Sequence, residues 1–317
     1  MDTLRSNQSE AREGFKNMKC LRNLIYIVLL CVGICSSAYA QFKAEVKTID
    51  VGDVKLAYYI RGQGKPLFMI NGFLSTMSLW DPALIEELAT NYQLILFDNR
   101  GVGLSTDTKE NNTTISQMAD DVAGLIKNLG YEKVNILAWS MGARIGQQLL
   151  IRHPALVEKA ILCSANPGGT HADKTALDTE SKLNNPNIPE MEKISLVFTN
   201  DEQGKQAAKD CLARLKEAVV AGTIPDDFTV SKETLIRQTR ARTTLWSGSN
   251  ENFDALKNIK NPVLLADGRS DIIDLPKNSV IIANQIPYSW TAFLEGGHAF
   301  LFQSHKQFSV LIYAFLQ

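Results

Sequence analysis

Residues 134–146 read VNILAWSMGARIG. An almost wholly apolar run stops at Ser140, with Ala138 two positions before the serine and Gly142 two positions after it. A stretch with helical character follows, residues 143–152. This pattern predicts a strand, a sharp turn with a serine at its apex, and a helix. Small neighbours favour such a turn, because larger side chains would collide at its strained backbone.

Such a turn would suit a reactive serine. It exposes the hydroxyl of Ser140 and directs the N–H of Met141 toward the same point, near a helix N-terminus where negative charge is favoured. The sequence departs from the G-x-S-x-G motif, because Ala138 stands at the first glycine. The alternative is therefore an ordinary serine in a strand-to-helix loop. Residues elsewhere in the chain are needed to distinguish a reactive serine from an ordinary one.

The composition is typical of a globular protein with a substantial core. The chain has 317 residues, a formal net charge of −1, 45% apolar residues and 21% charged residues. The near-zero charge, with no basic stripe interleaved with aromatics, argues against a nucleic-acid partner. No Cys/His cluster has metal-ligand spacing, so we expect no metal or other cofactor. We interpret Cys163 and Cys211 as buried thiols, with one disulfide as the alternative.

The first 40 residues differ from the rest of the chain. Residues 24–35 are almost wholly apolar, Lys19 and Arg22 lie just before them, and a small-x-small sequence ends at Ala40. This is the pattern of a secretory signal peptide, residues 1–40, cleaved after Ala40.

Cleavage would leave residues 41–317 as an exported protein, periplasmic or secreted if the source is bacterial, with no stable membrane span. The apolar run is short for a spanning helix, but an uncleaved N-terminal anchor is the alternative. The polar lead is longer than a signal peptide needs, so Met18 is an alternative start.

Eight stretches of strand length and composition alternate with helical patterns after an initial hairpin. Several strands are fully apolar, which is typical of strands buried on both faces of a mostly parallel sheet. We expect an α/β fold with helices on both faces and Ser140 at the carboxyl end of a strand, where ligands bind. The expected strands are residues 46–51, 54–60, 67–70, 93–97, 134–139, 159–164, 262–266 and 289–294.

The alternation stops at about residues 166–258. Residues 206–220 have an amphipathic helical pattern, and residues 231–244 are also expected to be helical. A solvated linker would lack such apolar faces. We therefore expect a helical cap inserted into the sheet domain.

A nucleophilic serine needs a base, usually a histidine, and the histidine needs a carboxylate. His153 lies at the far end of the helix that follows Ser140, about 15 Å away, and cannot reach it. His171 opens the insertion and His305 lies in the last helix. His298 follows two glycines at the end of a predicted strand, on the same sheet edge as Ser140, and is the best candidate for the base.

The carboxylate should also follow a strand. Asp271 lies three residues after Gly268 at the end of an apolar strand, and Asp274 is the second candidate; Asp267 should point elsewhere. The alternative for Asp271 is an aspartate that caps its own turn. The order Ser140, Asp271, His298 is the order expected of an α/β-hydrolase arrangement.

The chain resembles the α/β-hydrolase superfamily, in its bacterial esterase, lactonase and cofactor-free haloperoxidase-like branch. The resemblance spans about residues 43–317 and implies an eight-stranded sheet with a helical cap that roofs the substrate pocket. The matching stretches are Asn71-Gly72-Phe73, residues 98–105, residues 138–142, Gly268 with Asp271, and Gly297-His298.

The resemblance further implies that the N–H groups of Phe73 and Met141 form an oxyanion hole, and that residues 98–105 position the site. Two positions depart from the family pattern: Asn71 replaces a histidine, and Ala138 replaces a glycine. Relatives with an aspartate nucleophile, the haloalkane dehalogenases and epoxide hydrolases, are disfavoured by Ser140.

The expected function is that of an exported serine hydrolase acting on a small-molecule ester, lactone or related acyl bond through an acyl-enzyme. Trp139 would help to shape an apolar substrate pocket, unless it only packs in the core. Two alternatives stay open. One is a ligand-binding or receptor-like module with little turnover, since fold alone does not fix function. The other is perhydrolase or haloperoxidase-like activity with the same three side chains.

Overall fold

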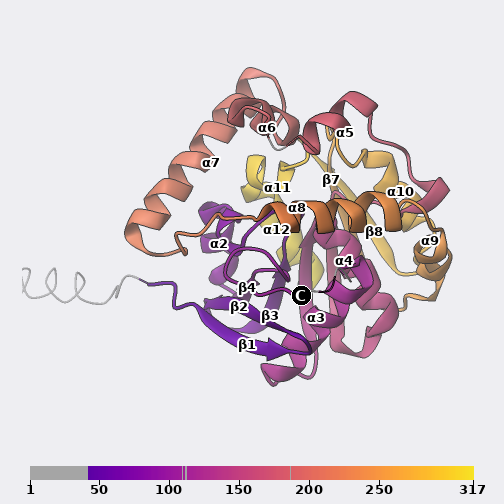
Figure 1. Ribbon diagram of the computed structural model, residues 1–317, viewed down its shortest axis with the longest axis horizontal. Coiled ribbons are helices and arrows are strands. Elements are labelled where there is room, and N and C mark those ends of the chain that lie inside the picture. The colour runs from indigo at the N-terminus through magenta and orange to yellow at the C-terminus, as the bar shows by residue number, and fades with distance from the viewer. Residues whose placement is uncertain (1–41, 109, 111–112, 186) are drawn as a thin grey trace, which may run out of the picture. The chain divides into compact units, whose positions relative to one another are not determined.

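Eight strands form one sheet in the order β1-β2-β4-β3-β5-β6-β7-β8 (Figure 1). The computed structural model describes residues 42–317 apart from 109, 111–112 and 186, and residues Ala44–Gln317 form one unit. The predicted signal peptide and the alternative start at Met18 lie outside the described residues. The strands are β1 Lys47–Val51, β2 Val54–Arg61, β3 Lys65–Ile70, β4 Tyr92–Phe97, β5 Val134–Trp139, β6 Val157–Cys163, β7 Val263–Gly268 and β8 Ser289–Leu294.

The pairing confirms the prediction of a mostly parallel sheet. Strand β2 is antiparallel to β1 and β4, whereas the strands from β4 across to β8 are parallel. The chain runs from β3 outward to β4 and then crosses to β5 on the other side of β3. The loops that follow β3 and β5 therefore meet at a topological switch point, where open α/β sheets bind ligands.

Both faces of the central strands are buried, as their continuous apolar sequences require. In β3, Phe68 and Ile70 belong to a core cluster with residues of α3, α4 and α10, and the alternating residues Leu67 and Met69 are equally buried. Helix α2 packs on β4 and α12, and α4 packs on β5 and β6. The helices outside the insertion are α2 Pro82–Ala89, α3 Ile115–Asn128, α4 Met141–Arg152, α10 Pro276–Ala283, α11 Phe300–Gln303 and α12 His305–Leu316.

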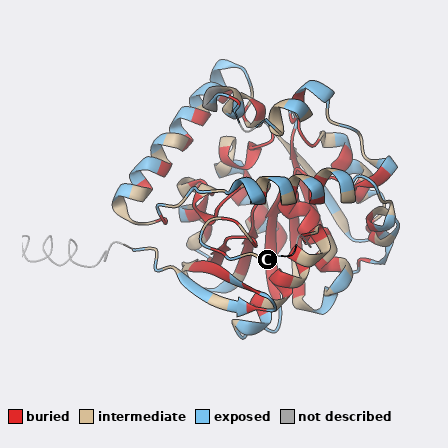
Figure 2. Ribbon diagram, in the orientation of Figure 1, coloured by how far each residue is buried: buried red, intermediate tan, exposed pale blue. Residues whose placement is uncertain are grey.

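The chain between β6 and β7 is helical wherever the structure describes it as regular. Figure 1 shows α5, α6 and α7 along the upper side of the molecule, and in Figure 2 their outer surfaces are exposed while the sheet below is buried. The helices are α5 Leu177–Leu183, α6 Glu190–Val197, α7 Glu202–Ala221, α8 Lys232–Thr239, a π-helical segment Arg240–Leu245 and α9 Glu251–Ala255.

Several details differ from the sequence expectations. The sequence did not indicate the short helices α5, α6 and α9, because short helices carry too few periodic positions to register. The closing helix is divided at Ser304 into α11 and α12, and the helix expected over residues 231–244 passes into the π-helical segment. Cys163 and Cys211 are both buried and free. No helix among the described residues is both long and apolar enough to cross a membrane.

Candidate active site

Ser140 occupies the turn between β5 and α4 with φ +59° and ψ −122°. This left-handed conformation is strained for a residue with a side chain. Helix α4 begins directly against the end of β3: a Cβ added at Gly142 would lie 2.2 Å from the carbonyl oxygen of Ile70. Only glycine fits at position 142, because the opposing atom is backbone.

Ala138, where the motif has glycine, is accommodated by a second small residue. The Ala138 side chain is fully buried, and a Cβ added at Gly146 of α4 would lie 3.2 Å from the Ala138 Cβ. The methyl group of Ala138 thus fills space that Gly146 leaves free. This exchange explains how the turn keeps its form despite the departure from the motif.

Three side chains that the sequence singled out form a continuous hydrogen-bonded row. The Ser140 Oγ lies 2.7 Å from His298 Nε2, and His298 Nδ1 lies 2.7 Å from Asp271 Oδ2. All three residues are buried, with exposed fractions of 8% for Ser140 and 3% for both His298 and Asp271. The structure therefore brings together a hydroxyl, an imidazole and a carboxylate drawn from three separate loops.

Two glycines allow the loops of Asp271 and His298 to approach each other. A Cβ added at Gly268 would lie 2.1 Å from the carbonyl oxygen of Gly297. The second carboxylate oxygen of Asp271 accepts the N–H groups of Ile273 and Asp274 at 2.7 and 3.1 Å. These bonds fix the carboxylate, so that one oxygen faces the turn and the other faces the imidazole.

The second candidate acid has a different partner. Asp274 binds the Arg144 guanidinium with both oxygens, at 2.9 and 3.1 Å, and also accepts a hydrogen bond from Asn166. Asp267 accepts the Ser279 hydroxyl at 2.8 Å and the Ser164 hydroxyl at 3.5 Å. Burial, followed by the neighbouring Asp271 charge, raises the pKa of Asp267 well above its ordinary value.

The other three histidines are engaged elsewhere. His153 Nε2 contacts Asp120, His305 Nδ1 contacts Glu87, and His171 stacks on Phe253. Among the histidines, His298 alone contacts Ser140 in the described part of the chain.

The electrostatic surroundings of His298 favour its charged form. Burial lowers the pKa of the imidazole, but the charge and hydrogen bond of Asp271, assisted by Asp274, outweigh burial and raise the pKa above its ordinary value. Arg144 opposes this effect. An imidazole with a raised pKa is a better acceptor for a hydroxyl proton.

The predicted oxyanion donors lie at the junction of two loops. A Cβ added at Gly72 would lie 3.5 Å from Ser140 Oγ, so the loop after β3 runs against the serine. Neither the Phe73 N–H nor the Met141 N–H donates a hydrogen bond to any described residue. Asn71 ties this loop by donating to the carbonyl oxygen of Thr76 at 2.5 Å.

Trp139 lies in an aromatic cluster next to His298. Its indole N–H donates to the His298 carbonyl oxygen at 2.9 Å, and its ring packs against Trp80 and Phe302. Only 8% of Trp139 is exposed. These contacts support the backbone of the histidine; a role in substrate binding stays a prediction.

The glycine-rich loop at residues 98–105 is held by two buried charged residues. Arg100 forms a two-pronged ion pair with Asp121, at 2.6 and 2.7 Å. The Asp98 carboxylate accepts the N–H groups of Met77 and Leu104. Burial raises the pKa of Asp98 to about 6, although both of these bonds favour its charged form.

Sequence reasoning missed three buried polar residues close to the site: Arg144, Gln238 and Arg242. Gln238 accepts the Leu74 N–H at 2.8 Å, and the Arg242 guanidinium lies 4.9 Å from the centre of the Phe73 ring. Arg144 is at a helical position that the sequence pattern would assign to solvent. No local pattern in the sequence marks these three side chains as buried.

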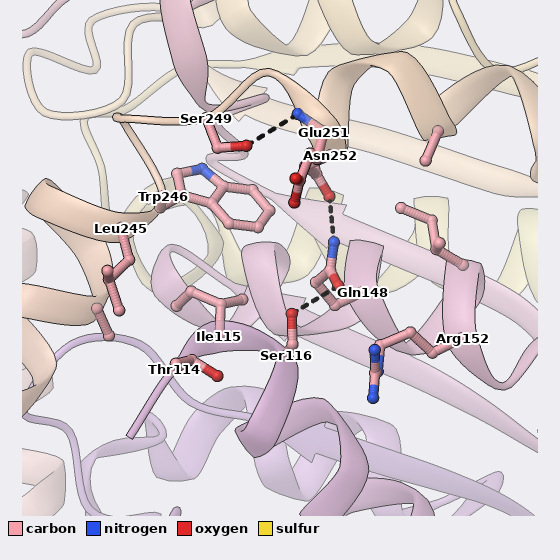
Figure 3. Close-up of a pocket in the computed structure, with 13 residues that line it drawn as sticks. Thr114, Ile115, Ser116, Gln148, Arg152, Leu245, Trp246, Ser249, Glu251 and Asn252 are labelled. Atoms are coloured by element: carbon pink, nitrogen blue, oxygen red, sulfur yellow. Dashed lines mark hydrogen bonds between the residues drawn. The ribbon is translucent and has the colours of Figure 1, made fainter. Parts of the chain in front are cut away.

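A separate hollow of about 410 Å³ is lined by none of the three residues Ser140, Asp271 and His298; Figure 3 shows side chains that line it. It lies between α3 and α4 on one side and residues 241–255 on the other, and Ile115, Leu245 and Trp246 supply apolar surface. Gln148 bridges Ser116 and Asn252 across it. Ser140 and His298 do not line this hollow.

The sequence model of the family described as alpha/beta hydrolase fold matches residues 65–304. With this match, and with the fold and the Ser140–His298–Asp271 row, the chain belongs to the alpha/beta hydrolase family.

The chain is similar in sequence to two proteins whose names refer to an activity. It is 28% identical to a protein of Mycobacterium tuberculosis provisionally named a non-heme bromoperoxidase, over 79% of this chain and 93% of the relative. It is 24% identical to a provisionally named carbamate hydrolase of Agrobacterium fabrum, over 79% of this chain and 92% of the relative.

Solved structures show the same fold. An alpha/beta hydrolase fold protein from Chitinophaga pinensis has a TM-score of 0.76 at 26% identity and covers 86% of this chain and 98% of its own. The enol-lactonase of Burkholderia xenovorans LB400 has a TM-score of 0.68 at 20% identity and covers 85% of this chain and 99% of its own.

Proposed function

We propose that this protein is a serine hydrolase that cleaves small-molecule carboxylic esters or lactones through an acyl-enzyme. One observation carries the proposal: Ser140 Oγ, the His298 imidazole and the Asp271 carboxylate form a row with 2.7 Å at each junction. This is the distance at which a base can take a hydroxyl proton and a carboxylate can hold the base in the required tautomer.

The proposed reaction has two acyl transfers. Ser140 Oγ forms a bond to the substrate carbonyl carbon while His298 Nε2 takes the hydroxyl proton, and the carbonyl oxygen becomes an oxyanion. Collapse breaks the bond to the leaving alkoxide, which receives the proton from His298. A water then gives its proton to His298 and its oxygen to the acyl carbon, and Ser140 leaves with the proton. The N–H groups of Phe73 and Met141 would stabilise both oxyanions.

A fluorophosphonate probe on residues 41–317, read by intact mass and peptide mapping, tests the proposal. We expect one adduct, on Ser140, and its loss in His298→Ala. Ser164, a buried serine near the site whose hydroxyl contacts the His298 carbonyl at 3.2 Å, is an internal control and should stay unlabelled. A Ser140→Ala protein that hydrolysed aryl esters at the wild-type rate would refute the proposal.

A panel of aryl esters, lactones and carbamates would then define the substrate class. The name of the Agrobacterium fabrum relative is the reason to include carbamates. No adduct and no turnover in a folded protein, together with stabilisation by a ligand, would instead favour the binding-module alternative.

Peracid formation is a second candidate, favoured by the likeness to the Mycobacterium tuberculosis relative. Hydrogen peroxide would replace water in the second transfer, so that the acyl-enzyme yields a peracid and free Ser140. Trapping of peracid with acetate and peroxide, dependent on Ser140, would distinguish this reaction from hydrolysis.

We also propose export, on the pattern of residues 19–40. Expression of the full chain in a bacterium should give a mature protein that begins at Gln41 in the periplasm or medium. A cell-associated protein that keeps residues 1–40 would favour the membrane-anchor alternative.

A further inference from the structure

The end of the insertion lies across both loops at the active-site edge of the sheet. We call residues 225–242 the strap. Toward the loop after β3, the Ser78 hydroxyl donates to the Pro225 carbonyl at 2.8 Å, and the Thr76 hydroxyl donates to the Asp227 carbonyl at 2.9 Å. The strap is thus fastened to the segment that contains the proposed donor Phe73.

The strap is also fastened to the glycine-rich loop. The Gly103 N–H donates to the Thr229 carbonyl at 3.2 Å, and the Thr234 hydroxyl donates to the Gly101 carbonyl. Arg237 forms an ion pair with Asp107 at 2.5 Å. The strap therefore has two sets of contacts, one to each loop, that substitutions can separate.

The strap contacts both Phe73 and the residue after it. The Arg242 guanidinium lies over its ring, and the Gln238 Oε1 accepts the N–H of the next residue, Leu74, at 2.8 Å. Leu74 has φ +53°, a backbone conformation that residues with a side chain disfavour. A residue in such a conformation keeps it only when its surroundings impose it.

Gln238 is an unusual choice if it only fills space. It is fully buried, and its Nε2 group has no hydrogen-bond partner among the described residues. A buried donor without a partner is unfavourable, so an apolar side chain would suit simple packing better. Among the residues that the structure describes, the bond from the Leu74 N–H to Oε1 is the one contact that requires the amide.

We propose that Gln238 is a positioning residue for the reaction: it fixes the peptide after Phe73 and so aims the Phe73 N–H at the oxyanion. The inference rests on the proposed function. It gives one residue of the insertion, Gln238, a role in the reaction. Without the acceptor, Leu74 would relax from its strained conformation and the donor would turn away from Ser140.

Gln238→Leu removes the acceptor at similar volume, and Gln238→Glu keeps one. Thr234→Val is the matched control, since it cuts a strap contact to the other loop. We expect Gln238→Leu to lower kcat for an aryl ester about 10- to 100-fold, with KM within about threefold, because a misdirected oxyanion donor weakens only the transition state. Gln238→Glu should recover most of the loss, and Thr234→Val should stay within about twofold of wild type.

Amide hydrogen exchange over residues 72–76 gives a readout that does not depend on turnover. Exchange should rise in Gln238→Leu and not in Thr234→Val. Equal losses of kcat in Gln238→Leu and Thr234→Val would mean general loosening and would overturn the role of Gln238, as would an unchanged kcat in Gln238→Leu. A wild-type protein inert to the fluorophosphonate probe and to esters would overturn the proposed function, and this role with it.

Discussion

The candidate active site lies where the strap meets the loops that follow β3, β5, β7 and β8. These two parts of the molecule, the strap and the sheet loops, are positioned by different means. The sheet loops are placed by backbone contacts that glycine permits, as at Gly142 against Ile70 and at Gly268 against Gly297. The strap is placed mainly by side-chain contacts, among them those of Gln238 and Arg242, with one backbone bond from Gly103 to Thr229. The sheet loops therefore depend on glycine at particular positions, whereas the strap depends on contacts that single side-chain substitutions can remove.

The largest effect should come from the acid of the row. Asp271→Asn keeps the shape but favours the wrong imidazole tautomer, and kcat should fall by about 10⁴-fold, the scale of this change in serine proteases. Asp274→Asn is the matched control three residues later. It breaks the buried ion pair with Arg144 and should lower the free energy of unfolding by about 3–5 kcal/mol, yet lower kcat less than about tenfold. The reverse ranking in kcat would make Asp274 the acid.

The second-largest effect should come from a substitution that disturbs the backbone contacts of the sheet loops. Gly142→Ala places a methyl group against the Ile70 carbonyl, and we expect a loss of about 1–3 kcal/mol in the free energy of unfolding, measured by urea denaturation, because a packed site must shift. Activity should fall as well, since the shift moves Ser140 and Met141. Gly130→Ala is the control: its φ is +82° but an added Cβ has no neighbour within 4 Å, so it should lose stability and keep kcat.

The sequence predicted the residues on the sheet loops but not those on the strap, and the reason is physical. Ser140, Asp271 and His298 each follow an apolar strand and lie beside glycines, a local signal that places them on one sheet edge. Gln238 lies in a helical segment with no such signal. Its contact with Leu74 spans 164 positions of the chain, and helical periodicity says which face is buried but not which residue that face meets.

The fold, like the site, was predictable from the sequence only in part. The apolar strands and their order were predictable, because strands buried on both faces have continuous apolar sequences. Helix α5 was not, since seven residues give less than two helical turns of pattern. The division of the last helix at Ser304 was also not predictable: the apolar positions continue across the break.

A smaller effect concerns the pH dependence of the proposed hydrolysis. The base must be neutral, and because Asp271 raises the pKa of His298 despite its burial, kcat/KM should decline with falling pH at a midpoint above the ordinary 6.5. Asp274→Asn removes one negative charge and leaves Arg144 unopposed, and both changes lower the pKa of His298. The acid limb of kcat/KM should therefore move to lower pH in that variant. A limb that moved upward would contradict the assigned electrostatics.

The smallest effect should come from the strap contact farthest from Phe73. Arg237→Met removes the ion pair with Asp107 and the bond to the Thr108 carbonyl but keeps an apolar stem of similar length. Both charged side chains are partly exposed, so the pair should contribute no more than about 1 kcal/mol to stability. The free energy of unfolding and its salt dependence would measure this. If the strap acts on the reaction through Gln238, kcat should stay within about twofold of wild type. A tenfold loss of kcat in Arg237→Met would instead show that the strap moves as one body. The unit to compare with the sheet loops would then be the whole strap, and not the single residue Gln238.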